Sequence, residues 1–313
     1  MKHLDFSPTP IEKLEHLSAR FGKNIFTKRD DLFSKGGGGS KARMLQYILA
    51  EVANGDYDVL VTAGGPCSNF NRACSLMCAK LGIPIHLIEY TENENEYETS
   101  FNYFISSLAG IRKTRCRKTE VVETIDRVIK AYQNNGKKVF HIYGGGKSLE
   151  GVFAYYAAVA ELIKQTTTEF DEIYVACGTG TTLTGLSAGF QKYSPNTIIH
   201  AISVARNKAN EWPVLTSDIA LLNSFMSSSF NLSNIVYHDE YICGGYGEIC
   251  VDELNAIKYC ISEEGMLVDP IYSGKAFWGM CEELKRSDAK NVLFWNTGAV
   301  FNLLQYSNEF NIL

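Results

Sequence analysis

Short apolar runs alternate with amphipathic patterns along most of this chain. Buried β-strands are predicted where hydrophobic residues follow one another without a helical period, at 58–64, 83–90, 137–143, 171–178, 197–205 and 291–298. Helices are predicted where apolar positions recur at helical spacing, as at 41–52, 68–82 and 148–165. Strands that alternate with helices form parallel sheets with helices on their faces, so the pattern predicts an α/β fold.

One segment departs from this alternation. The stretch 90–103 reads "YTENENEYETSFNY" and is acidic and polar, which predicts a solvated loop leading into a helix. No repeat, linker or low-complexity stretch is visible beyond one run of four glycines. The pattern therefore marks no domain boundary, although 313 residues suffice for two packed units or one large domain.

Composition narrows the class of protein. A hydrophobic content of 45% with 21% charged residues is ordinary for a soluble enzyme. The net charge of −5 argues against non-specific nucleic-acid binding. No apolar run of about 18 residues suggests a membrane span, and the N-terminus lacks a signal-peptide core. The nine cysteines form no C-x-x-C and show no zinc-type spacing. We expect reduced thiols, a cytoplasmic location and no metal site.

The run of glycines at 36–39 leads directly into Ser40, Lys41 and a helix. A flexible linker is disfavoured because the helical pattern begins without a pause. A nucleotide phosphate loop needs glycine before the lysine and a hydroxyl after it, but Ser40 and Ala42 occupy these positions. A lysine in a first helical turn is pushed toward its neutral, nucleophilic form, which Schiff-base chemistry requires. A plain surface lysine remains the alternative at this point.

A second glycine-rich loop favours the chemical interpretation. The stretch "VACGTGTTLTGLSAGF" at 175–190 predicts a strand, a tight turn and a helix, an arrangement that binds phosphate on backbone N–H groups. The third glycine of a dinucleotide fingerprint would fall at Leu183, and no acidic residue ends the strand at 197–205. A cofactor with a single phosphate fits better. Together with an activated lysine, this suggests pyridoxal 5′-phosphate.

These motifs resemble the fold-type-II pyridoxal-phosphate enzymes, the tryptophan synthase β-like group. Within it, the chain is similar to the branch of 1-aminocyclopropane-1-carboxylate deaminase and D-cysteine desulfhydrase. The match runs in order across nearly the whole chain. Its segments are "TKRDDLFSKGGGGSKARML", "TAGGPCSNFNRACSLMCAKLG", "GTGTTLTGL", "GGYGE", "VDPIYSGKAFWGM" and "LFWNTGA".

The resemblance implies a role for particular residues. Lys41 would be the Schiff-base lysine and would carry the α-proton. The phosphate would be bound by the loop Gly178, Thr179, Gly180, Thr181 and Thr182, whose other interpretation is a plain tight turn. Ser68 would face the substrate carboxylate and Asn69 the cofactor's ring oxygen, although both are also good N-caps.

The C-terminal half supplies the remaining implied residues. Tyr246 and Tyr272 would direct hydroxyls at the substrate, against the alternative of simple packing. Thr297 would lie near the pyridine nitrogen. The architecture implied is a large cofactor-binding domain of 1–42 and 151–313 with a smaller α/β domain inserted at 43–150. The cofactor would lie between the two domains, and the chain would form a homodimer.

Four positions depart from the family's pattern, and they leave the substrate open. Ser40 replaces asparagine, Cys67 replaces glutamine, Thr181 replaces one glycine of the phosphate loop, and Ala299 replaces the last glycine of the closing pair.

The leading hypothesis is a lyase that eliminates thiol from a small amino acid such as D-cysteine. The deaminase branch typically has glutamate after the tyrosine of D-P-x-Y and a final H-L-G-G, whereas this chain has Ser273 and Thr297. Alternatives are cyclopropane ring opening and β-replacement. A cofactor-binding scaffold without activity would lack the lysine, and a dehydrogenase would need the missing glycine.

Overall fold

The computed structural model describes residues 1–310, and the chain divides into two compact units. Unit 1 comprises Met1–Ser7 and Phe33–Gly151; unit 2 comprises Pro8–Leu32 and Val152–Leu313. Unit 1 reaches further toward the N-terminus than the predicted insertion at 43–150, because residues 33–42 pack with it. The division into folding domains stays a prediction.

Unit 1 is built on a four-stranded sheet in the order β5-β4-β3-β6, and all its strands are parallel. The strands are β3 (Val59–Gly64), β4 (Ile85–Tyr90), β5 (Arg112–Cys116) and β6 (Val139–Ile142). The central strand β3 is buried at every position. Such a strand lies inside a sheet that is covered on both faces, as expected for parallel pairing.

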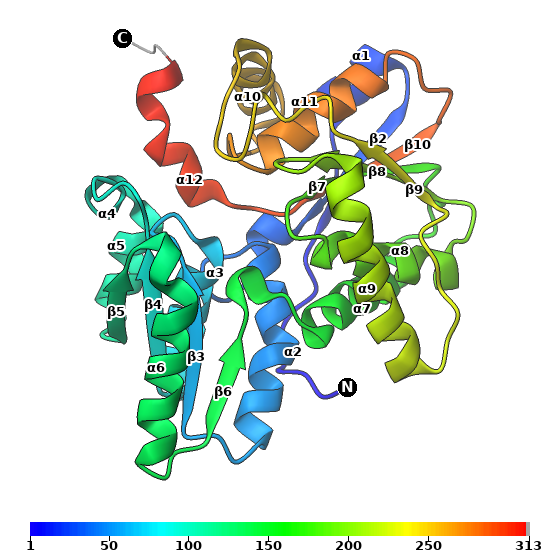
Figure 1. Cartoon of the computed structure of the whole chain (residues 1–313). Coiled ribbons are helices and arrows are strands. Elements are labelled where there is room, and N and C mark those ends of the chain that lie inside the picture. The colour runs from blue at the N-terminus through cyan, green and yellow to red at the C-terminus, as the bar shows by residue number, and fades with distance from the viewer. Residues whose placement is uncertain (311–313) are drawn as a thin grey trace. The chain divides into compact units, whose positions relative to one another are not determined.

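The helices of unit 1 follow their strands in the chain. They are α2 (Ser40–Asn54), α3 (Asn69–Leu81), α4 (Glu96–Thr99), α5 (Phe101–Leu108) and α6 (Val121–Asn134), with single 3₁₀ turns at η2 (Lys118–Glu120) and η3 (Gly144–Gly146). Helix α6 runs along the sheet (Figure 1), and Val128 from it is buried with Val61, Ala63 and Ile88. Helices α2 and α3 pack against each other. The predicted loop at 90–103 contains α4, which the sequence analysis missed.

Unit 2 contains a six-stranded sheet in the order β1-β2-β10-β7-β8-β9. The strands are β1 (Ile11–Lys13), β2 (Asn24–Arg29), β7 (Glu172–Cys177), β8 (Ile198–Ser203), β9 (Ile235–His238) and β10 (Asn291–Asn296). Only β1 is antiparallel to its neighbour. Each predicted strand corresponds to an observed one, and the α/β fold is confirmed. Strands β1, β2, β5 and β9 were not predicted.

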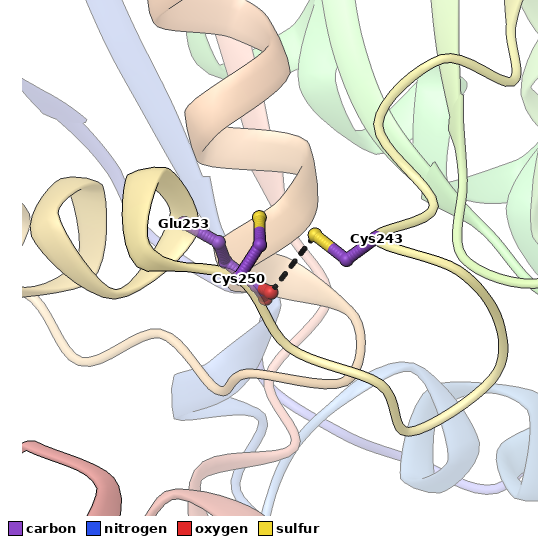
Figure 2. A group of neighbouring side chains, drawn as sticks. All are labelled: Cys243, Cys250 and Glu253. Atoms are coloured by element: carbon purple, nitrogen blue, oxygen red, sulfur yellow. Dashed lines mark hydrogen bonds between the residues drawn. The ribbon is translucent and has the colours of Figure 1, made fainter.

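Helices make up the rest of unit 2 among the described residues. They are α1 (Glu15–Phe21), α7 (Leu149–Gln165), most of which lies in this unit, α8 (Thr181–Tyr193), α9 (Lys208–Met226), α10 (Val251–Glu264), α11 (Ser273–Glu283) and α12 (Val300–Gln305), with 3₁₀ turns η1 (Asp30–Leu32) and η4 (Ser307–Phe310). The loop before α10 carries Cys243 and ends at Cys250 (Figure 2). No helix within residues 1–310 is both long and apolar enough to cross a membrane.

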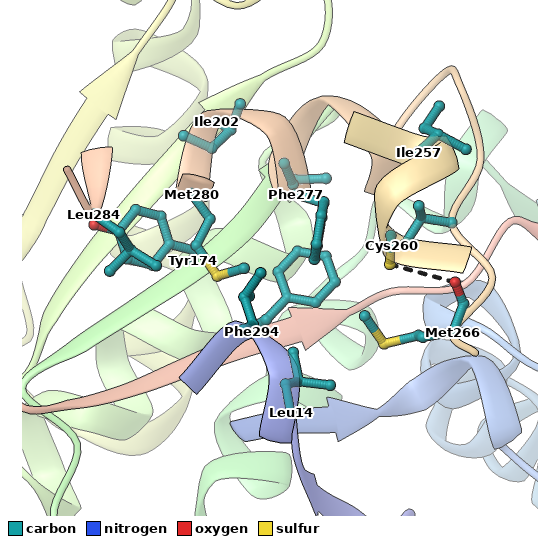
Figure 3. Close-up of a cluster of buried hydrophobic side chains, with 14 of the residues drawn as sticks. Leu14, Tyr174, Ile202, Ile257, Cys260, Met266, Phe277, Met280, Leu284 and Phe294 are labelled. Carbon is teal, nitrogen blue, oxygen red and sulfur yellow. Dashed lines mark hydrogen bonds between the residues drawn. The ribbon is translucent and has the colours of Figure 1, made fainter. Parts of the chain in front are cut away.

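Neighbouring residues of β10 show how the two faces of this sheet are covered. Phe294 packs edge-on against Phe277 of α11, in the core cluster of Figure 3. The next residue, Trp295, points to the other face, where its ring meets Tyr155 of α7 and Phe190 of α8. Side chains alternate along a strand, so one strand joins two separate layers of helices.

The "KRDD" motif of the sequence forms a buried polar network in unit 2. Asp30 is fully buried, and it accepts hydrogen bonds from Trp295 Nε1 at 2.8 Å, Tyr155 Oη at 3.0 Å and Thr9 Oγ1 at 2.9 Å. Lys28 is equally buried and pairs with a carboxylate of α7, that of Glu161, at 2.6 Å. These contacts tie β2 to α7 and β10.

Candidate active site

The four glycines before Lys41 adopt backbone angles that other residues rarely take. Their φ values are 58°, 77°, 78° and 89° from Gly36 to Gly39. A side chain would strain each position, so glycine is required by conformation rather than by flexibility. Helix α2 begins at Ser40, and Lys41 lies in its first turn, half-buried, as predicted.

A buried arginine of α3 holds this loop in place. The Arg72 guanidinium is 1% exposed and donates hydrogen bonds to the carbonyls of Gly36 at 3.2 Å, Gly37 at 3.4 Å and Gly38 at 3.0 Å. Burial lowers the pKa of Arg72 to about 10, so the group still carries its charge at neutral pH. The run of left-handed glycines turns these carbonyls toward one cation, which fixes the approach to Lys41.

Arg72 also orients the two predicted residues at the start of α3. Asn69 is buried, and its Oδ1 accepts from Arg72 Nη1 at 2.9 Å, leaving the Nδ2 amine as its donor group. Ser68 is the N-cap, where its Oγ accepts from the Asn71 N–H at 3.1 Å. The hydroxyl hydrogen of Ser68 can therefore still donate.

Asn102 of α5 extends the same network. Its Oδ1 accepts from Arg72 Nη1 at 3.0 Å, and its Nδ2 donates to the Cys67 carbonyl at 3.1 Å. The sequence analysis named neither Arg72 nor Asn102 as a site residue. The arginine stood in the quoted motif "SNFNR", whereas nothing in the sequence signalled Asn102.

The predicted phosphate loop of unit 2 connects β7 to α8. Gly180 is the N-cap of α8 with φ 80°, and Thr181 is the first helical residue. Thr181 has a negative φ, which explains how threonine replaces a glycine of the family's pattern. Thr179 Oγ1 lies 3.4 Å from Thr181 Oγ1, and Thr182 is also buried.

Gly180 is needed for a different reason from the one expected. A Cβ on this residue would lie 2.7 Å from Glu211 Oε1 and 2.7 Å from Leu215 Cδ2, both on α9. The hydrogen of Gly180 therefore faces protein. At Gly178 a Cβ would lie 3.3 Å from the ring of Tyr272, in the same unit.

The donor groups of this loop fit a phosphate. The first N–H groups of a helix have no partner within the helix, and they attract anions. Three threonine hydroxyls lie beside them, at 179, 181 and 182. The one carboxylate that approaches Gly180, that of Glu211, is neutralised by Arg206 at 2.8 Å.

Tyr246 and Tyr272 are brought together, and each hydroxyl is hydrogen-bonded to the other. Tyr246 is exposed, while Tyr272 is half-buried just before α11. Asp269 shapes the turn beneath them by accepting from the N–H of Tyr272 at 3.2 Å and of Ser273 at 2.9 Å. Burial raises the pKa of Asp269 to about 6. Sequence reasoning did not single out this aspartate, although it precedes Pro270 in the quoted motif.

Thr297 is buried in the loop that follows β10. Ser273 Oγ donates to the carbonyl of Gly298 at 3.0 Å and to Asp269 Oδ1 at 2.8 Å, so it joins this loop to the turn before α11. Ala299, which stands where the family has a second glycine, keeps a glycine-like φ of 75°.

Comparisons with known proteins agree with this geometry. A family model described as "Pyridoxal-phosphate dependent enzyme" matches residues 3–298. A Thermotoga maritima protein named "Putative 1-aminocyclopropane-1-carboxylate deaminase" is 31% identical and covers 98% of each chain. A D-cysteine desulfhydrase of Klebsiella pneumoniae is 29% identical over 96% of this chain and 94% of its own.

Solved structures show the same relationship. The structure titled as an "ACC deaminase homologue" has a TM-score of 0.90 at 28% identity and covers 98% of this chain and 95% of its own. A serine racemase from Dictyostelium discoideum shares the fold, with a TM-score of 0.67 at 15% identity over 94% of this chain and 93% of its own.

Proposed function

Because the chain belongs to the pyridoxal-phosphate dependent enzyme family, we propose that it is a lyase acting on a small β-substituted amino acid such as D-cysteine. Its cofactor is pyridoxal 5′-phosphate. The net reaction takes up one water and releases pyruvate, ammonia and sulfide. The substrate and the leaving group are the proposed part; the family and the cofactor are its premise.

We assign the cofactor's two ends to the two glycine-rich loops. Lys41 Nζ would hold its aldehyde carbon covalently, and the amides and hydroxyls of 178–182 would hold its phosphate. When bound, pyridoxal phosphate acts as an electron sink that makes the substrate's Cα–H acidic. The first turn of α2 lowers the pKa of an amine by its partial positive charge, which favours a Lys41 able to accept that proton.

Residues at the start of α3 suit the substrate's carboxylate. Ser68 accepts a backbone hydrogen bond and keeps its own hydrogen to donate. The N-terminus of a 13-residue helix adds a favourable potential for an anion. Asn69, which Arg72 orients, would donate from Nδ2 to the cofactor's ring oxygen.

The tyrosine pair suits the departing group. Tyr246 and Tyr272 share one hydrogen bond, so one of the two hydroxyl hydrogens stays available to a neighbouring acceptor. A hydroxyl here would donate a proton to a leaving thiolate. The exposure of Tyr246 allows the loop that carries it to adjust when substrate enters.

One observation carries the choice of a lyase. Ser273 and Thr297 are buried neutral hydroxyl residues, and Ser273 Oγ bonds to the carbonyl that follows Thr297 in the chain. In the deaminase-like pattern a glutamate and a leucine stand at these two positions. A carboxylate near the ring changes its protonation, and opening a strained carbon–carbon bond requires a different electronic setting from expelling a thiolate. Neutral groups at both positions favour elimination.

The second candidate function is that of the deaminase branch, and it is supported by the names of relatives at similar identity. It would convert 1-aminocyclopropane-1-carboxylate to 2-oxobutyrate and ammonia. β-Replacement, in which a second nucleophile adds in place of the thiol, uses the same residues up to the departure of sulfide.

The test is a substrate screen with purified holoenzyme. D-cysteine, L-cysteine and 1-aminocyclopropane-1-carboxylate are compared by the formation of sulfide, pyruvate and 2-oxobutyrate. We expect pyruvate and sulfide from D-cysteine and little or no 2-oxobutyrate. Efficient 2-oxobutyrate formation with D-cysteine inert would establish the deaminase instead. Inertness toward both would contradict both assignments and direct attention to Cys67 and Ser40.

We also propose a homodimer in the cytoplasm. The dimer is the family expectation, and sedimentation of the holoenzyme tests it. All nine cysteines are free in the structure, which suits a reducing compartment.

A further inference from the structure

The loop that carries Tyr246 is bounded by two cysteines. It runs from Cys243 to Cys250, between β9 and α10. The buried ammonium of Lys275 donates to the carbonyls of Ile242 at 2.7 Å and Gly245 at 3.1 Å, which fixes the first half of the loop. Cys243 has a φ of 58°, an angle that cysteine seldom adopts.

A carboxylate completes the group in Figure 2. Glu253 lies in the first turn of α10 and is fully buried. Its Oε2 accepts from Cys243 Sγ at 3.5 Å, but its Oε1 has no hydrogen-bond partner in the structure. Burial raises the pKa of Glu253 to about 8. Buried polar atoms are nearly always satisfied, so an orphaned carboxylate oxygen indicates that a partner is missing.

The three ligand atoms have nearly the spacing that zinc requires. One atom from each of Cys243, Cys250 and Glu253 lies within 4.8 Å of the other two. Zinc–sulfur and zinc–oxygen bonds of about 2.3 and 2.0 Å at tetrahedral angles place sulfur and oxygen about 3.5 Å apart, and two sulfurs about 3.8 Å apart. The Cys243–Glu253 separation already has this value. Closing the remaining edges takes a shift of about 1 Å or less.

The charges around the group also balance. Two thiolates and one carboxylate bring three negative charges. A divalent cation leaves one, which the nearby Lys275 ammonium offsets. The other charged neighbour is Asp269, whose carboxylate is held by the backbone of the turn before α11.

We propose that Cys243, Cys250 and Glu253 form a Zn²⁺ site, with water in the fourth position. Binding displaces the thiol protons to solvent and satisfies the free carboxylate oxygen. The ion ties both ends of the loop to α10 and so restricts the movement of Tyr246. The sequence gave no hint of this, because two cysteines six residues apart match no zinc pattern and the third ligand comes from a helical turn. The site does not depend on which amino acid the enzyme uses.

The experiment measures zinc on the intact holoenzyme. Protein is freed of metal with a chelator, kept reduced with a phosphine, and dialysed against Zn²⁺; bound metal is counted by elemental analysis. We expect one Zn²⁺ per chain and the release of about two protons on binding. Hydrogen exchange of residues 244–248 should slow when Zn²⁺ is added.

Variants locate the ion. Cys243→Gly removes a ligand and accepts the positive φ, so the fold should persist while zinc affinity falls at least about 100-fold. Cys250→Ser should act similarly, and Glu253→Gln should lower affinity about 10- to 100-fold. Cys281→Ser is the matched control, a half-buried cysteine of the same unit outside this group, and it should leave one Zn²⁺ bound. Absence of bound zinc in the wild type would overturn the proposal, as would full retention in both Cys243→Gly and Cys250→Ser.

Discussion

Two glycine-rich loops precede helices in this protein, and they expose opposite sides of the backbone. The loop at 36–39 turns its carbonyls toward a buried cation, Arg72. The loop at 178–182 ends at the N-terminus of α8, where N–H groups and threonine hydroxyls are suited to an anion. The first loop is satisfied from within its own unit, whereas the second is built to be satisfied by a ligand. Glycine content alone does not distinguish the two.

The largest effect expected concerns the lysine that follows the first loop. Lys41→Ala should lower kcat/KM by about a thousandfold or more, because the covalent anchor and the proton acceptor are lost together. The fold should persist, as circular dichroism can verify. Borohydride reduction and peptide mapping of the wild type should place the pyridoxyl group on Lys41; a label on another lysine would remove this loop from the active site.

Arg72 tests the carbonyl side of the comparison. Arg72→Met should lower the free energy of unfolding by about 3–5 kcal/mol, since three loop carbonyls and two asparagine oxygens lose a buried charged donor. Arg72→Lys keeps the charge but not the planar fork, and we expect about half that loss. Urea unfolding measures both. Arg112→Lys on the exposed side of β5 serves as the control, and an equal effect there would mean that the guanidinium does not support the loop.

The second loop could be predicted more fully than the first. Phosphate binding follows from strand, glycine turn and helix in sequence order, so 178–182 could be assigned by local pattern. The support for 36–39 comes from Arg72 and Asn102, which lie more than 30 residues away and meet the loop only after the sheet of unit 1 forms. The buried strands were predictable from apolar runs. β5 was not, because its sequence "RKTRC" is polar and its place at a sheet edge is set by pairing with β4.

Gly180 tests what glycine does in the second loop. Gly180→Ala should lower the free energy of unfolding by about 2–3 kcal/mol, of which about 1 comes from the positive φ and the rest from contact with Glu211 and Leu215. It should also weaken cofactor retention by shifting the start of α8. Gly22→Ala is the matched control, because its φ is 64° with no atom within 4 Å of the added carbon. Equal losses in the two variants would show that α9 does not constrain the loop.

The smallest effect sharpens the comparison by reversing it. Ala299 holds a φ of 75° without being glycine, directly after Thr297 and Gly298. If left-handed φ is what both glycine loops require, then Ala299→Gly should relieve strain and raise the free energy of unfolding by about 0.5–1 kcal/mol, even though glycine adds entropy to the unfolded chain. Ala289→Gly, outside the left-handed region, should destabilise instead. Thermal unfolding of the holoenzyme measures the difference between the two variants. A loss of stability in both would mean that the Thr297 loop is not strained, and that departure from the family's glycine carries no cost at this position.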